Sequence, residues 1–208
     1  MPSTVGILSG AGSLKNPAEA IALGYRINYI SNPSFEVDAS GWGSVGGATL
    51  TRVTSESNTG SAALQVTNTS ASGFQTTSRI PFLGGQGTYV VSAYIKLGTG
   101  ATTSNYFLRH LQYESLAASG TVSSGNVGTT SLSDNGNWTR ISGTFTRNSV
   151  ADYFIIRVST SSTTSGDIYY VDSIMVEKAN SVGSYFDGSS GGFWTGASHG
   201  SFSGGTPY

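Results

Sequence analysis

Side chains that commonly carry out catalysis are sparse in this sequence. It contains two histidines, His110 and His199, and no cysteine. Thiolate chemistry and Cys-based zinc sites are therefore excluded, and a histidine-rich metal centre lacks ligands. A Ser-His-Asp set would have to combine Asp187, His199 and a nearby serine, and glycine-rich surroundings would hold it loosely. Eleven acidic residues leave a two-carboxylate glycosidase open by number, but nothing marks out a pair, so we expect no enzyme.

Aromatic and polar side chains on strand-like segments suit sugar binding better than catalysis. An aromatic ring offers a broad apolar face to the C–H surface of a sugar, and polar groups can bond its hydroxyls. The candidates are Tyr94, Lys96, Tyr153 and Arg157, joined by either Tyr106 and His110 or Arg109 and Tyr113. In a second interpretation these aromatics bind no sugar. They instead close the edge of the sandwich or lie under a docked tail or partner.

The segments that must position these side chains are predominantly strands. The segment 89–97 alternates, with Tyr89, Val91, Ala93, Ile95 and Leu97 on one face. Further strands are expected at 62–68, 106–114, 138–146, 153–160 and 167–177. Turn chemistry separates them, for example Asp134-Asn135-Gly136-Asn137 before the strand at 138. Short strands at this spacing predict an all-β sandwich over residues 28–179.

The N-terminal arm, residues 1–27, carries one helix signal. Asn16 suits the N-cap, Pro17 the first helical position and Gly24 the position just past the end. A helix of about two turns is marginal alone, so it should dock, either on its own domain or on a partner.

The C-terminal tail, residues 180–208, interleaves aromatic residues with glycine and serine. A free polar linker would not keep such side chains exposed, because apolar surface usually marks a contact site. The residues expected to make assembly contacts are Tyr185, Phe186, Asp187, Phe193 and Trp194.

The charge balance excludes several partners. The formal net charge is −1, and no basic run offers the clustered Lys and Arg that nucleic-acid binding needs. No stretch approaches the ~20 apolar residues of a membrane span, so no membrane insertion is expected. The first thirteen residues do not resemble a secretory signal.

Landmarks in order resemble the CenC-type carbohydrate-binding modules. The box from Asn28 to Glu36 is followed by Gly41-Trp42. Segments that resemble later strands of that family follow in order at 60–66, 87–96, 138–145 and 169–177. The resemblance implies a jelly-roll β-sandwich. It also implies a structural calcium ion that ties the first strand to the last through Glu36 and Asp172, with no other cofactor required. The alternative is that Glu36 accepts backbone hydrogen bonds and that Asp172 pairs with an arginine or caps a turn.

The tail is similar to the closing segment of tailed-phage structural proteins. The residues that carry this likeness are Tyr185-Phe186-Asp187-Gly188, Trp194-Thr195-Gly196 and Ala197-Ser198-His199. The combination implies a virion protein, most simply a minor tail protein, assembled in the host cytoplasm with other virion proteins and copies of itself, with a host-surface glycan as a further partner. Alternatives are a head decoration protein, a tail-associated glycan hydrolase and a carbohydrate-binding module of a secreted glycoside hydrolase.

Overall fold

The computed structural model describes residues 16–69, 73–132, 136–162 and 164–207. Residues 1–15 of the arm, with Asp134 and Asn135 of the predicted turn, lie outside the described residues. The predicted helix is confirmed as α1, Pro17–Ala22, and the Asn16 side chain caps it by accepting from the Ala18 amide at 2.9 Å. Among the described residues no helix is long and apolar enough to cross a membrane.

The remaining elements are strands. Their bounds are β1 Tyr25–Asn28, β2 Trp42–Val45, β3 Thr49–Val53, β4 Ala63–Thr67, β5 Gly73–Thr76, β6 Ile80–Pro81, β7 Thr88–Leu97, β8 Ser104–Tyr113, β9 Ser123–Leu132, β10 Thr139–Thr146, β11 Tyr153–Thr160, β12 Ile168–Glu177, β13 Phe193–Trp194 and β14 Ser203–Pro207.

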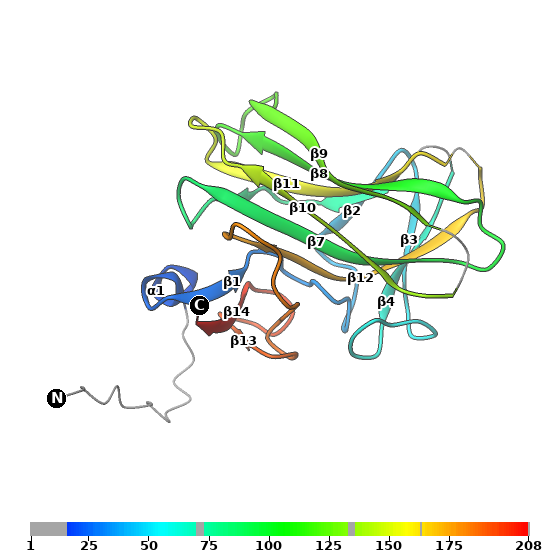
Figure 1. The fold of residues 1–208 in the computed structure, drawn as a ribbon, viewed down its shortest axis with the longest axis horizontal. Helices are drawn as coiled ribbons and strands as arrows, with labels where there is room; N and C mark the ends of the chain where they lie inside the picture. Colours follow the sequence, from blue (N-terminus) through cyan, green and yellow to red (C-terminus); the bar gives the residue numbers. More distant parts are fainter. Residues whose placement is uncertain (1–15, 70–72, 133–135, 163, 208) are drawn as a thin grey trace.

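Two antiparallel sheets face each other and form a jelly-roll β-sandwich (Figure 1). One sheet has the strand order β10-β7-β12-β4-β3. The other has the order β2-β5-β11-β8-β9, with β6 paired to β11. Strands that follow one another in sequence, such as β7 and β8, therefore belong to opposite sheets. The predicted fold class is confirmed.

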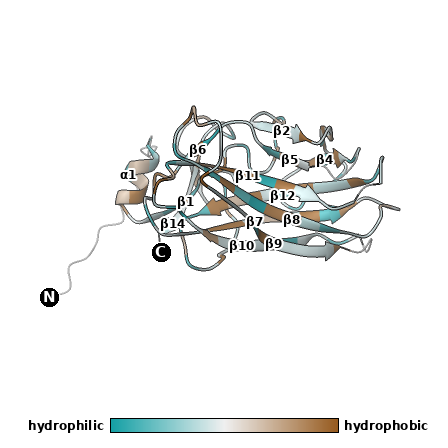
Figure 2. Cartoon of the chain, turned by 90° about the horizontal axis from the view of Figure 1, so that it is seen from above, coloured by the Kyte–Doolittle hydropathy of each residue, from teal (hydrophilic) through white to brown (hydrophobic). Residues whose placement is uncertain are grey.

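The core lies between the two sheets, where strand alternation places apolar side chains. All five residues predicted to share one face of β7 are buried there, and Tyr89 stacks on Phe145 of β10 at 5.8 Å between ring centroids. Hydrophobic and hydrophilic segments alternate along β7, β8 and β11 (Figure 2).

A third, small sheet joins the two ends of the chain. Its order is β1-β14-β13, so residues of the arm pair with residues of the tail. The helix α1 packs on β1 and β14, and β1 also contacts β12 of the five-stranded sheet. Nε and Nη2 of Arg26 donate to the carboxylate of Glu177 at 2.8 and 2.7 Å, and the Arg26 guanidinium lies 4.6 Å from the Phe186 ring centroid. Arm and tail are thereby fastened to the sandwich.

The box around Asn32 forms a compact loop after β1. Asn32 has a positive φ of 48°, and its side-chain amide donates to the backbone oxygens of Asp38 and Ser40. Its own carbonyl accepts from the indole of Trp42 at 3.1 Å. Trp42 then packs on Phe74, with 5.2 Å between ring centroids. The sequence landmarks therefore mark a loop that seats the first tryptophan in the core.

Candidate functional site

The outer face of the six-stranded sheet carries a strip of large side chains on two central strands. We call it the β8–β11 face, and it consists of Phe107, Arg109, Leu111 and Tyr113 of β8 with Tyr153, Ile155, Arg157 and Ser159 of β11. These residues pair directly across the two strands, Tyr113 with Tyr153 and Arg109 with Arg157. The six residue-to-residue steps from Phe107 to Tyr113 give the strip a length of about 20 Å.

Hydrogen bonds and ring contacts fix the polar side chains of this face. Arg157 donates twice to the side-chain oxygen of Gln75 on β5, at 2.7 and 3.0 Å. Arg109 donates to the hydroxyl of Ser124 on β9 at 3.3 Å. The guanidinium of Arg79 lies 3.8 Å from the centroid of the Tyr113 ring. Aromatic faces and hydrogen-bonding groups thus stand side by side on one surface.

The electrostatics of the face are dominated by the two cross-strand arginines. Burial lowers the pKa of Arg157 from its usual value, and the neighbouring Arg109 charge lowers it further. The Nε of Arg109 is buried and has no hydrogen-bond partner within the described part of the chain. A like-charged pair of this kind raises the free energy of the unliganded face.

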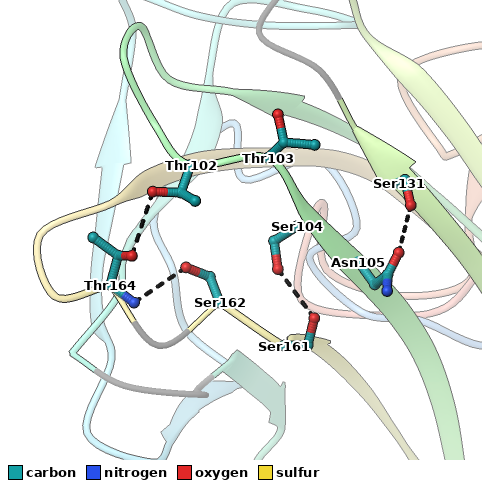
Figure 3. Close-up of a pocket in the computed structure, with 8 residues that line it drawn as sticks. All are labelled: Thr102, Thr103, Ser104, Asn105, Ser131, Ser161, Ser162 and Thr164. Carbon is teal, nitrogen blue, oxygen red and sulfur yellow. Dashed lines mark hydrogen bonds between the residues drawn. The ribbon is translucent and has the colours of Figure 1, made fainter.

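A polar pocket of about 420 Å³ lies where β8 begins and β11 ends (Figure 3). It is lined by Thr102, Thr103, Ser104, Asn105, Ser131, Ser161, Ser162 and Thr164. All eight side chains end in a hydroxyl or an amide, and none is charged or aromatic. Asn105 and Ser131 are paired across β8 and β9, on the same side of the sheet as Phe107. The pocket therefore continues the β8–β11 face at one end.

The hydroxyls of this pocket are linked mainly to one another. Ser104 and Ser161 share a hydrogen bond of 3.1 Å, and Thr102 donates to Thr164 at 3.3 Å. The Asn105 side-chain oxygen accepts from Ser131. Hydroxyls can exchange such bonds for bonds to a ligand hydroxyl, because each is both donor and acceptor.

The structure separates the sugar-binding residues that the sequence suggested. Tyr94 and Lys96 lie on the outer face of the five-stranded sheet, whereas Tyr153 and Arg157 lie on the β8–β11 face of the other sheet. Lys96 is paired with Glu56 at 2.8 Å. The expectation of one shared site is corrected here. β7 and β11 belong to opposite sheets, so their outward side chains lie on opposite sides of the sandwich.

Tyr106 and His110 are corrections as well, since both side chains point into the core. Tyr106 is 1% exposed and packs on Tyr169, and burial raises the pKa of its phenol to about 12. His110 is 7% exposed and stacks on Phe145. Neither ring can reach a sugar at the surface. The alternative choice on this strand, Arg109 with Tyr113, is the one that faces outward.

Three residues that contact the face were not singled out from the sequence. Gln75 belongs to the short strand β5, Arg79 to the segment between β5 and β6, and Ser124 to β9, whose composition is mostly Ser, Thr and Gly. The pairing of β5 and β9 with the central strands brings Gln75 and Ser124 to the site, and Arg79 reaches it through the Tyr113 ring.

Glu36 lies in the loop after β1 and Asp172 lies on β12, and the carboxylate oxygens of both already accept hydrogen bonds. Glu36 accepts from the Ser61 amide and hydroxyl and from the Ala62 amide. Asp172 accepts from the amides of Asn58 and Thr59 at 2.7 and 2.9 Å and from that of Ser173 at 2.6 Å. Burial raises the pKa of Asp172 to about 7.

This donor set does not fit a calcium ion well. Calcium takes six to eight oxygen ligands, whereas N–H groups occupy every oxygen of these two carboxylates. No group of three or more His, Cys, Asp or Glu suited to a metal occurs within the described residues. The two carboxylates instead bind the loop before β4 directly, and calcium stays a prediction from the resemblance.

The tail brings Ser189 and His199 within 3.5 Å of each other, but no Ser-His-Asp set forms. The Asp187 carboxylate, 2% exposed, is used by the hydroxyls of Ser34 and Tyr185 and by the Ser189 amide. Nδ1 of His199 has no partner among the described residues, so no carboxylate orients the imidazole. The segments 188–192 and 196–200 read Gly-x-Ser-x-Gly, yet neither joins a strand to a helix.

The other predicted assembly residues also make contacts inside the chain. Phe186 is 3% exposed beside Arg26, and Phe193 meets Tyr25 edge to face at 5.4 Å. Trp194 is half-buried beside His199, at 4.7 Å between ring centroids. Phe186 and Asp187 are therefore interior residues of this chain. Contacts of the tail with other subunits stay a prediction.

Comparisons with known proteins agree with this architecture. Residues 27–165 match the model of the CBM 4/9 family, described as a carbohydrate binding domain. No curated protein matches the chain. A family 22 carbohydrate-binding module of Clostridium thermocellum xylanase 10B aligns with a TM-score of 0.60 at 21% identity, over 74% of this chain and 96% of that one.

Other solved structures share the fold. A xylan-binding domain from Paenibacillus barcinonensis Xyn10C has a TM-score of 0.60 at 17% identity, over 75% of this chain and 96% of that one. The structure of the N-terminal CBM22-1 and GH10 modules of C. thermocellum xylanase 10B, solved with xylohexaose, has a TM-score of 0.60 at 22% identity. The match covers 74% of this chain but only 29% of that solved chain. At these identities the structural matches show the fold. The family model matches more than half of the chain, so the chain belongs to the CBM 4/9 family of carbohydrate-binding domains.

Proposed function

We propose that this protein is a non-catalytic glycan-binding module and that the β8–β11 face, with the hydroxyl-lined pocket at its end, holds the glycan. The observation that carries the proposal is the cross-strand pair of Tyr113 and Tyr153 on an outer sheet face that also carries Arg157, bonded to Gln75. Aromatic faces receive the C–H surface of a sugar, and the fixed guanidinium and amide groups supply directed hydrogen bonds.

The strip and the pocket suit a chain of sugars rather than a single one. The strip extends for about 20 Å along β8, and an aromatic pair, an aliphatic pair and an arginine pair follow one another along the strands. The pocket adds uncharged hydroxyls at one end, where the last sugar unit of a bound chain would lie. Two solved relatives by fold were crystallised with β-linked oligosaccharides, namely xylohexaose and β-1,4-galactotriose, which makes these two compounds the first probes.

Isothermal titration calorimetry with a panel of oligosaccharides, starting from these two, tests the proposal. We expect Tyr113→Ala and Tyr153→Ala each to weaken binding about tenfold, because truncation of an aromatic hot-spot residue costs more than about 1 kcal/mol. Tyr94→Ala tests the opposite face, where Tyr94 lies 5.5 Å from the Arg140 guanidinium. Loss of binding in Tyr94→Ala with unchanged affinity in Tyr113→Ala would move the site to that face.

A virion role is a second candidate, and the observation that favours it is the tail. The residues that carry the phage likeness form a defined unit, in which Trp194 contacts Ser189 at 3.2 Å and the β13-β14 pair joins the arm. We infer from the sequence likeness alone that the tail would hold the module in a phage tail or head beside other virion proteins. Mass spectrometry of purified particles tests this role. Absence of the chain from the particles, with glycan binding intact, would leave the first proposal standing alone.

A further inference from the structure

The charged residues are divided unevenly between the two sheets. The strands of the six-stranded sheet contain Arg109 and Arg157 but no Asp or Glu. In the five-stranded sheet, by contrast, Lys96, Arg52 and Arg140 stand with Asp172 and Glu177. The net charge of the whole chain is −1, so the positive charge of the β8–β11 face is local.

The arginines of this face have no acidic partner within the described chain. The ion pairs within the described residues involve Arg26, Lys96 and Arg147, none of which lies on this face. Arg79 instead donates to the backbone oxygens of Ser115 and Ala118. Arg109 and Arg157 use neutral acceptors, a serine hydroxyl and a glutamine oxygen. Arg109 and Arg157 therefore both have guanidinium N–H groups that donate to no carboxylate within the described residues.

The placement of these charges is energetically unfavourable without a ligand. Arg109 and Arg157 stand directly opposite each other on neighbouring strands, an arrangement in which like charges destabilise a sheet. Both are half-buried, so water screens their repulsion less than at a free surface. Burial and the Arg109 charge both lower the pKa of Arg157, in keeping with a shortage of counter-charge. An anion between the two guanidinium groups would relieve the repulsion.

Resting on the proposed function, we infer that the glycan bound by the β8–β11 face carries carboxylate groups, as in a chain that contains uronic acids. A planar carboxylate matches the fork of a guanidinium and can accept two parallel hydrogen bonds from it. The aromatic pair Tyr113 and Tyr153 lies about 13 Å along the strands from the arginine pair. One sugar unit would therefore stack on the tyrosines while the carboxylate of a more distant unit meets the arginines.

The experiment compares one polysaccharide in two forms. Glucuronoxylan and the same material after chemical reduction of its carboxyl groups to alcohols differ only in the charge. We expect the wild-type protein to bind the carboxylated form at least tenfold more tightly at 50 mM NaCl, and the difference to shrink at 500 mM NaCl because the interaction is partly screened. Arg109→Gln and Arg157→Gln should remove the difference, while Arg140→Gln, a matched change on the opposite sheet, should keep it.

Each outcome separates the inference from the proposed function. Equal binding of the carboxylated and reduced forms would overturn the carboxylate and leave the glycan-binding proposal intact. Binding of neither form, nor of any neutral oligosaccharide in the panel, would overturn both. Equally tight binding of a sulfated xylan would overturn the choice of carboxylate in favour of charge alone. Each variant is compared only if its melting temperature lies within about 3 °C of wild type, which shows that its domain is still folded.

Discussion

The imidazole of His110 lies parallel to the Phe145 ring, with 4.7 Å between the ring centroids and 6° between their planes. Its Nδ1 accepts from the side-chain amide of Gln112 at 3.2 Å, and the oxygen of that amide accepts from the Asn148 backbone. The orientation of the Gln112 amide is therefore fixed. Nδ1 of His110 must carry no proton to accept the amide N–H, so the imidazole is neutral. Burial, with a smaller contribution from Arg109, lowers the pKa of His110 to about 4.

This low pKa predicts an acid-sensitive contribution to stability. Between pH 6.5 and 4 the unfolded chain protonates His110 whereas the folded chain does not, so His110 favours unfolding increasingly as the pH falls. The full shift corresponds to about 3 kcal/mol. In His110→Phe, which keeps a ring on Phe145, this contribution should vanish. The measurement is the free energy of urea unfolding at several pH values, read as wild type minus variant. His199→Gln is the control, and a flat difference curve for His110→Phe would contradict the prediction.

Asp172 should act in the opposite direction over nearly the same range. Burial raises its pKa to about 7, although three backbone amides bond the carboxylate and favour its charge. Between pH 4 and 7 the unfolded carboxyl is ionised while the folded one retains its proton, so this group lowers stability as the pH rises. Asp172→Asn should remove that slope, and the loss of one amide acceptor should cost about 1–2 kcal/mol. A pH slope identical to that of wild type would show that the folded carboxyl is already ionised at pH 4.

The prediction for calcium follows from the hydrogen bonds of Glu36. Because this carboxylate binds the Ser61 and Ala62 amides directly, we expect the melting temperature to be the same in excess calcium and in excess chelator. Glu36→Gln should still lower stability, by about 1–3 kcal/mol, since its amide nitrogen would face a backbone donor. A chelator-sensitive melting temperature in wild type that is lost in Glu36→Gln would instead establish the ion.

The sequence predicts strands whose two faces differ and misses strands whose faces do not. The alternation along 89–97 locates β7 to within a residue, and the capping residues locate α1. β9 has ten residues but only Val127 and Leu132 as aliphatic side chains, so it shows no apolar period. Its place is fixed by backbone bonds to β8 and by Gly128, where an added Cβ would lie 2.9 Å from Ile141 of β10. Such contacts depend on the assembled sandwich.

The candidate site shows the same limit. Periodicity shows that Tyr94 and Tyr153 both face outward, but not that they face outward from opposite sheets. That information lies in which strands pair, and β7 and β11 share no partner. Residues on one strand are placed correctly relative to one another, as with Tyr153 and Arg157. The family likeness predicted the jelly roll, whereas the face that carries unpaired charge became visible only when the strands were assigned to sheets.

The glycines of the tail explain how its aromatics pack, and they provide the last prediction. A Cβ added at Gly204 would lie 2.2 Å from the ring of Phe193, so the ring lies flat on the bare backbone of β14. Gly204→Ala should displace Phe193 from Tyr25 and loosen the β1-β14-β13 sheet, at a cost of about 1–3 kcal/mol. Gly120→Ala, where nothing lies within 4 Å of the added carbon, is the matched control.

Hydrogen exchange measured by mass spectrometry should locate the effect of Gly204→Ala. Amides of β1 and β14 should exchange faster, while those of β8 and β11 keep their protection, because the small sheet contacts the sandwich through β12 (Figure 1). Glycan affinity should be unchanged for the same reason, since the β8–β11 face belongs to the other sheet. Faster exchange across the whole sandwich would mean that arm and tail are part of one cooperative unit with it, and unchanged exchange in β1 would mean that Phe193 does not hold the tail in place.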